Sequence, residues 1–179
     1  IKRSVLGGRN FEYYSEDPVL SGALGAAFIN GVQSQGVGTS LKHYVANNVE
    51  TRRMHINSDL DMRTLHEIYL TPFEIAVKKA QPWTVMACYN RVQEVYGTQS
   101  PYLLTEMLKN HWGFEGIVIS DWNAVVDRVE GVKAGMHIEM PGITNWYNDQ
   151  LIVEAVKSGE LDEQVLDNVV AEILMIVFK

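Results

Sequence analysis

The side chains of this 179-residue chain that are best suited to catalysis or ligand binding follow short apolar runs. Lys42 and His43 come at the end of the first run, Tyr89 at the end of the second, and Asp121 with Trp122 after the third. A carboxylate at the end of a buried strand can act as a nucleophile, a general acid or a general base. Asp121, directly after "GIVIS", is therefore the first candidate for a catalytic group.

Four apolar or β-branched runs, at residues 39–44, 84–89, 116–120 and 137–140, predict strands separated by helical periodicity. This alternation indicates βαβ units and a parallel sheet. Helix boundaries are expected at the N-cap residues Asp17, Asp61 and Ser100 and at the stop residues Gly36 and Gly113, with a kink or break at Pro72 and a final helix with one apolar face after Asp162.

A closed barrel of eight βα units takes ~250 residues, so four units make half of one. An open half barrel would leave two edge strands unpaired and an apolar interior exposed to water. We therefore expect the chain to associate with the remainder of a barrel, in the same or another polypeptide. The opening Ile1-Lys2-Arg3 reads as mid-domain sequence, which favours a fragment.

Composition excludes several function classes. With 46% hydrophobic and 21% charged residues the chain reads as an ordinary soluble globular protein. The net charge of −7 argues against nucleic-acid or membrane-surface partners, and no apolar run approaches a membrane span. The five His residues and Cys88 show no metal-ligand spacing, and no glycine loop fits a phosphate, so no metal or cofactor is predicted. The compartment, cytoplasmic or secreted, stays open.

Five blocks occur in order between about Gly7 and Gly142: "GRNFEYYSEDP", "KHYVANNVETRRM", "VMACYN", "SPYLLTEMLKNHWGFEGIVISDW" and "VVDRVEGVKAGMHIEMPG". Together they resemble the first domain of family-3 glycoside hydrolases of the β-glucosidase group. The resemblance implies the C-terminal half of a TIM-type (β/α)8 barrel, with residues 1–143 as partial catalytic barrel and 144–179 as its closing helices. It also implies a second domain, carrying the acid/base carboxylate, outside this chain.

The family resemblance implies a retaining, exo-acting β-glycosidase that removes terminal β-D-glucosyl residues from a carbohydrate substrate through a covalent glycosyl-aspartate. Asp121 matches the nucleophile, which nearby Lys42, His43 and Arg53 would help to keep ionised. The residues that match the sugar-binding positions are Arg9, Lys42, His43, Arg53, Met86, Tyr89 and Trp122.

Other interpretations of these residues stay open at this stage. Asp121 could cap a helix that starts near Asn123, His43 could be a core histidine, and Met86 and Tyr89 could be packing residues. Lys42 could form the Schiff base of a barrel lyase, or the chain could be a non-catalytic half-barrel scaffold.

For several residues near these positions in the sequence we expect structural rather than catalytic roles. We expect Glu12 to hold Arg9, Arg52 to face solvent, and Glu139 to pair with a lysine or arginine. Trp83, Trp112 and Trp146 are interpreted as packing residues.

The chain departs from the family pattern at Asn123, at Gln93-Glu94 and at His137, which stands where the family has Asp. The first two changes leave aglycone specificity open. The "PGHG" motif of the N-acetylglucosaminidase branch is absent after Lys42-His43, which favours glucosides or xylosides.

Overall fold

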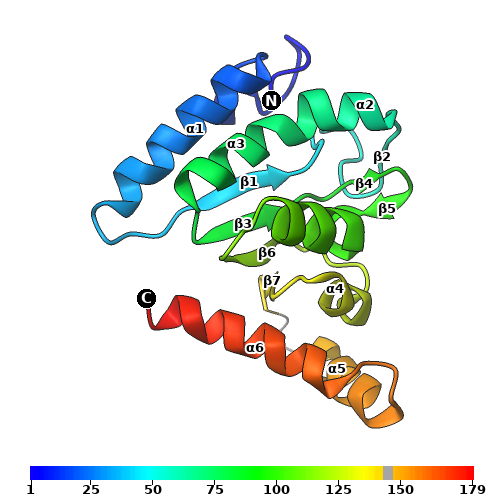
Figure 1. Cartoon of the computed structure of the whole chain (residues 1–179). Coiled ribbons are helices and arrows are strands. Elements are labelled where there is room, and N and C mark those ends of the chain that lie inside the picture. The colour runs from blue at the N-terminus through cyan, green and yellow to red at the C-terminus, as the bar shows by residue number, and fades with distance from the viewer. Residues whose placement is uncertain (143–146) are drawn as a thin grey trace.

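A computed structural model describes residues 1–142 and 147–179. Its main sheet contains β1 (Ser40–Tyr44), β3 (Thr84–Ala87), β6 (Ile117–Trp122) and β7 (Ile138–Met140), in that spatial order and all parallel. The four predicted strands are therefore confirmed, and they lie side by side in sequence order (Figure 1). Parallel strands in sequence order require a helix between each pair, which places all their C-terminal ends at one edge.

Helix α1 (Pro18–Gln33) precedes β1, and the helices that connect or follow the strands are α2 (Met62–Thr64), η2 (Leu65–Leu70), α3 (Thr71–Ala80), η4 (Tyr102–His111), α4 (Arg128–Ala134), α5 (Tyr147–Ser158) and α6 (Glu163–Val177). The predicted N-caps are confirmed: Asp17 accepts from Leu20 N at 2.7 Å and Asp61 from Thr64 N at 2.8 Å. Ser100 Oγ accepts more weakly from Leu103 N, at 3.3 Å.

A kink or a break was expected at Pro72, and the break is not found. The chain stays helical from Met62 to Ala80, through α2, η2 and α3. η2 has π-helical hydrogen bonding, and α3 begins one residue before Pro72, where the missing N–H of proline is tolerated. The His66 carbonyl at the junction accepts both from the Thr71 N–H and from the Thr71 hydroxyl, the latter at 2.7 Å.

The larger hydrophobic core lies between the sheet and the helices α3, η2 and η4. Tyr44 is fully buried there, with its ring edge-on to Phe73 and Trp112, and its hydroxyl donates to the Leu103 carbonyl at 3.0 Å. Trp112 is thus a packing residue, as expected. A second cluster joins α4, α5 and α6 through Val129, Val132, Ala155, Leu161 and Val169. Trp146 falls outside the described residues.

The small sheet of β2 (Asn57–Ser58), β4 (Arg91–Val92) and β5 (Val95–Tyr96) was not predicted. Gln93 and Glu94 form its turn and both have positive φ, at 50° and 71°. Tight hairpins need this backbone geometry, which Asn-Gly adopts more easily. Asn57 compensates, because its side chain accepts from Glu94 N at 2.9 Å and donates to Glu94 Oε1 at 2.7 Å.

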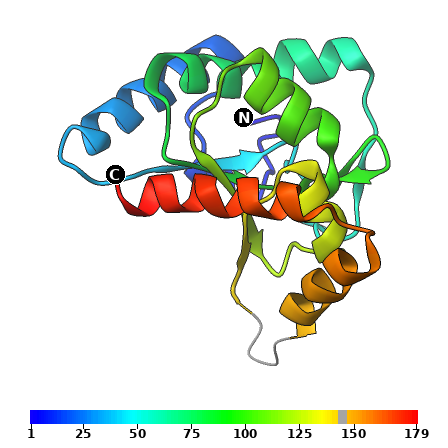
Figure 2. The same ribbon diagram turned by 60° about the horizontal axis from the view of Figure 1, so that its bottom comes forward.

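The final helix is confirmed, with Asp162 capping Gln164 N at 2.9 Å. α6 runs across the sheet from α5 toward the C terminus (Figure 2) and contacts β6. Its predicted apolar face is only partly covered: Val169 is buried, whereas Val170 and Leu174 are about half exposed. No helix within the described residues is long and apolar enough to cross a membrane.

His137, where the family has Asp, connects α6 to the sheet. Its Nδ1 accepts from Val118 N at 3.0 Å, and its Nε2 lies 2.5 Å from Glu172 Oε2 on α6. Glu172 also pairs with Lys109 on η4. Burial lowers the pKa of His137, so the imidazole is neutral at pH 7. It therefore joins β6 to α6 through hydrogen bonds to Val118 and Glu172 and not through a charge of its own.

Candidate active site

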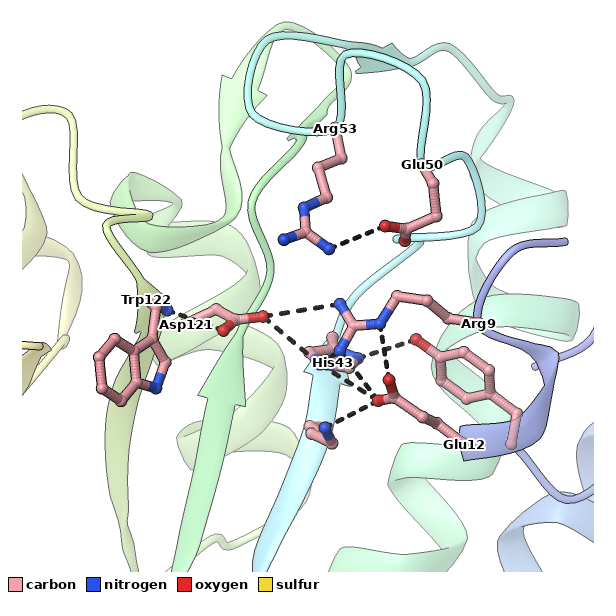
Figure 3. Close-up of polar contacts among 9 residues, drawn as sticks. Arg9, Glu12, His43, Glu50, Arg53, Asp121 and Trp122 are labelled. Carbon is pink, nitrogen blue, oxygen red and sulfur yellow. Dashed lines mark hydrogen bonds and ion pairs between the residues drawn. The ribbon is translucent and has the colours of Figure 1, made fainter.

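A cluster of charged side chains lies at the C-terminal edge of the sheet. It combines residues at the ends of β1, β3 and β6 with the loop around η1 (Asn10–Glu12) (Figure 3). This edge is where parallel α/β sheets and barrels carry their ligands. The structure brings Arg9, Lys42, His43, Arg53, Tyr89 and Asp121 together there.

Asp121 points into this cluster from the end of β6. β6 ends at Trp122, so Asp121 is the second-last residue of the strand rather than the first residue after it. Asp121 Oδ1 accepts from Trp122 N at 2.7 Å. Asp121 Oδ2 is buried and has no hydrogen-bond partner of good geometry. His43 Nε2 lies 3.4 Å and Arg9 Nη1 4.0 Å from this oxygen, and the Tyr89 hydroxyl also lies close to the Asp121 carboxylate.

The helix-cap interpretation of Asp121 is wrong. No helix begins near Asn123, which has a positive φ of 59°, and α4 starts only at Arg128. Asp127 is the residue that caps α4, accepting from Glu130 N at 2.9 Å. A buried carboxylate oxygen without a donor is costly to maintain, which makes Asp121 a functional candidate.

Glu12 organises two of the cations. It accepts from Arg9 through both oxygens, at 2.8 and 2.9 Å, and lies 2.7 Å from Lys42 Nζ. The predicted Glu12–Arg9 contact is thus confirmed, and Lys42 is its second partner. Burial alone would raise the pKa of Glu12, but the hydrogen bonds from Arg9 and Lys42 outweigh it and lower the pKa to about 2. Glu12 is therefore ionised throughout the physiological range.

His43 is fully buried between Arg9 and Tyr13. Its Nε2 lies 2.9 Å from Arg9 Nη2, and its Nδ1 lies 2.8 Å from the Tyr13 hydroxyl. Burial, reinforced by Arg9 and Lys42, lowers the pKa of His43 to about 4. The expectation that His43 would help to keep Asp121 ionised is therefore wrong, because the imidazole carries no charge at pH 7.

Lys42 and Arg53 each pair with another carboxylate, so their expected support of the Asp121 charge stays a prediction. Arg53 Nη1 donates to Glu50 Oε2 at 2.8 Å, and its guanidinium lies 4.6 Å from the centre of the Tyr89 ring. Arg9 is the cation closest to Asp121. Burial raises the pKa of Tyr89, and the adjacent Asp121 carboxylate raises it further.

Trp122 follows Asp121 at the end of β6, while Met86 lies inside β3 rather than at its end. Met86 is half-buried on β3 opposite Ile119, on the sheet face away from Val85 and Ala87, which are fully buried under the helices. Trp122 is 58% exposed, so its indole remains available to a ligand. Arg52 is exposed, as expected.

The fourth strand end contributes a structural ion pair. Glu139 Oε2 lies 3.8 Å from Arg128 Nε, as the sequence analysis expected for this carboxylate. Within residues 1–142 and 147–179, no group of three or more His, Cys, Asp or Glu side chains is placed to hold a metal ion.

Two residues of the cluster escaped the sequence analysis. Glu50 could have been found from its spacing, since an acid three residues before Arg53 is a common ion-pair arrangement. Tyr13 carries no such signal, because its contact with His43 spans 30 residues of chain.

The chain matches the family model described as "Glycosyl hydrolase family 3 N terminal domain" over residues 1–176. It therefore belongs to glycosyl hydrolase family 3. The match covers nearly the whole chain.

Curated relatives include thermostable β-glucosidase B from Acetivibrio thermocellus, 57% identical over 181 residues that cover 99% of this chain and 23% of the relative. An exo-α-(1→6)-L-arabinopyranosidase from Bifidobacterium breve is 49% identical over 100% of this chain and 23% of its own length. The chain thus spans about a quarter of the length of these relatives.

Among solved structures, β-glucosidase 3B from Thermotoga neapolitana in complex with glucose matches with a TM-score of 0.94 and 51% identity, over 99% of this chain and 26% of that chain. The predicted fold class, part of a (β/α)8 barrel, is confirmed by this similarity.

Proposed function

We propose that this chain supplies the nucleophile and most of the sugar-binding cations of a retaining β-glycosidase. The single observation that carries the proposal is Asp121 Oδ2, a buried carboxylate oxygen without a hydrogen-bond donor at the ligand edge of the sheet. An oxygen in this state has its lone pairs available for attack on carbon.

In the first step, Asp121 Oδ2 forms a bond to the anomeric carbon while the bond from that carbon to the glycosidic oxygen breaks. The departing oxygen takes a proton from a carboxylic acid, and water later hydrolyses the glycosyl-aspartate. Glu12 is unsuited to the acid role, because its pKa of about 2 leaves it without a proton at neutral pH. The acid is therefore proposed to come from outside this chain.

The charges of the cluster favour an uncharged ligand. Arg9, Lys42 and Arg53 are balanced by Glu12, Glu50 and Asp121, while His43 is neutral. Guanidinium groups held by carboxylates still present fixed N–H donors to sugar hydroxyls. Trp122 offers an exposed indole face for the apolar side of a sugar or aglycone.

The sugar is proposed to be a terminal β-D-glucosyl residue. The name of the Acetivibrio relative supports glucose, while the name of the Bifidobacterium relative shows that a similar segment serves an arabinopyranosidase. Groups outside the chain are then expected to complete sugar selection.

Edge strands β1 and β7 are proposed to pair with the remainder of the barrel, in the same or another polypeptide, and a second domain to supply the acid. Nothing in the cluster favours the lyase, since Lys42 Nζ is ion-paired to Glu12 rather than held in an apolar pocket.

The test joins the chain to the rest of the barrel and the second domain and measures release of an aryl aglycone from an aryl β-glucoside. Asp121→Asn should abolish turnover, while Glu16→Gln, at an exposed acid in the same loop region, should not. A 2-deoxy-2-fluoro-β-glucoside with a good leaving group should add one sugar mass to the peptide that contains Asp121. Turnover that persists in Asp121→Asn, or a label on another peptide, would refute the proposal.

A further inference from the structure

His43 has an unusual pair of neighbours for a buried imidazole. One ring nitrogen faces a guanidinium and the other faces a phenol, at 2.9 and 2.8 Å. The guanidinium of Arg9 has only N–H donors and no acceptor, so His43 Nε2 must accept this hydrogen bond. The single proton of the neutral ring then lies on Nδ1 and is donated to the Tyr13 oxygen.

The position of this proton matters for Asp121. His43 Nε2 lies 3.4 Å from Asp121 Oδ2, the oxygen that has no hydrogen-bond donor. With a lone pair rather than a proton on Nε2, the imidazole cannot donate to that oxygen. A proton on Nε2 would place a donor against Asp121 and make its oxygen a weaker nucleophile.

We propose that Tyr13 is a positioning residue that acts with Arg9 to hold His43 as the neutral tautomer protonated at Nδ1, and so keeps a proton donor away from Asp121 Oδ2. The tautomer follows from the contacts alone, and only its consequence for a nucleophile rests on the proposed function.

The other groups around His43 agree with a neutral ring. Arg9, Glu12 and Tyr13 face it from the N-terminal segment, Lys42 from β1 and Asp121 from β6. A second ring proton would point at the Arg9 guanidinium, and burial disfavours the charge, as the low pKa of His43 reflects. Glu12 Oε2 is farther from Nε2, at 3.8 Å, and is already engaged by Arg9 and Lys42.

His137 provides an internal reference, because its contacts require the opposite tautomer. Its Nδ1 accepts from the Val118 N–H, so its proton lies on Nε2 and is donated to Glu172. The two buried histidines should therefore show opposite tautomers in one spectrum. The remaining three histidines are His55, His66 and His111.

The experiment is long-range ¹H–¹⁵N correlation NMR on the full chain with ¹⁵N-labelled histidine at pH 7, where the ring nitrogen without a proton resonates far downfield of the protonated one. The His43 signals are assigned by their loss in His43→Gln. We expect an Nδ1–H pattern for His43 and an Nε2–H pattern for His137.

Tyr13→Phe should raise the share of the Nε2–H tautomer of His43 without removing the Nδ1–H form, because Nδ1–H loses its acceptor whereas Arg9 still donates to Nε2. Tyr14→Phe is the matched control and should leave the His43 signals unchanged. In both variants an unaltered His137 pattern reports that the fold is retained.

The inference fails if wild-type His43 is Nε2–H or charged at pH 7, or if Tyr13→Phe leaves its tautomer unchanged while His137 keeps its pattern. It also fails if both histidines show the mixed tautomers of free imidazole. An assembled protein that is inactive but shows the expected tautomers would refute the proposed function and leave the role of Tyr13 intact.

Discussion

Replacement of Glu12 by Gln should destabilise the chain in a manner that depends on pH. Glu12 is the shared partner of Arg9 and Lys42, so the neutral amide leaves two cations close together without a counter-charge. The reduction in the pKa of Glu12 from its usual 4.5 to about 2 corresponds to ~3 kcal/mol at ~1.36 kcal/mol per pH unit. Solvent screens part of this interaction, because Lys42 is 40% exposed, so we expect about 1–2 kcal/mol at pH 7.

The sign of the pH dependence follows from the direction of the change in pKa. Because the folded chain holds the carboxyl below its unfolded value, ionised Glu12 stabilises the fold fully above about pH 4.5. That contribution disappears as the pH falls toward about 2. The difference between wild type and Glu12→Gln should therefore be largest at pH 7 and clearly smaller at pH 3.

Urea unfolding followed by tryptophan fluorescence at both pH values measures this difference, since Trp112 lies in the core. Glu16→Gln is the control, because this exposed acid should change stability little at either pH. Equal destabilisation by Glu12→Gln at pH 7 and pH 3, or none at pH 7, would refute the assigned ion-pair energetics.

Three further changes test the core and the backbone. Trp112→Ala should lower the unfolding free energy by about 3–5 kcal/mol, because a buried indole leaves a large cavity, and a melting temperature close to wild type would contradict the assigned core. Gly116→Ala should destabilise strongly in a thermal melt, since an added Cβ would lie 2.4 Å from the Trp83 carbonyl oxygen, whereas Gly31→Ala in α1 meets nothing within 4 Å and should stabilise by up to ~1 kcal/mol. Cys88 is buried and burial raises its pKa to about 12, so a disulfide reagent should label it only after denaturation; rapid labelling of the folded chain would show that this region opens.

Much of the fold could be predicted from local sequence, because the responsible interactions are local. Asp17 and Asp61 cap their helices as predicted, and Asp162 caps the final helix that was predicted to follow it, each within three residues of itself. The π-helical hydrogen bonding in η2 and η4 was not predicted, since helical periodicity does not distinguish it from an α-helix. The two-residue strands of the small sheet were also too short to leave a periodic signal.

The candidate site was only partly predictable. Strand ends and family blocks led to Asp121, Arg9 and His43, and parallel strands in sequence order ensure that such ends meet at one edge. The charge pairing was not predictable: Arg53 forms an ion pair with Glu50, and Lys42 forms one with Glu12.

The sequence by itself determined the identity and order of the reactive groups, because apolar periodicity and caps set which residues fall at strand ends. Only the tertiary structure decided their protonation and their partners. The charge of His43 depends on burial and on Arg9, which lies 34 residues away in the chain. The lack of a hydrogen-bond partner for Asp121 Oδ2 likewise depends on which groups the N-terminal segment and β1 place within 4 Å of it. Electrostatic energies depend on the distances between charges and on their exposure to solvent, and neither quantity can be predicted from the spacing of residues along a chain.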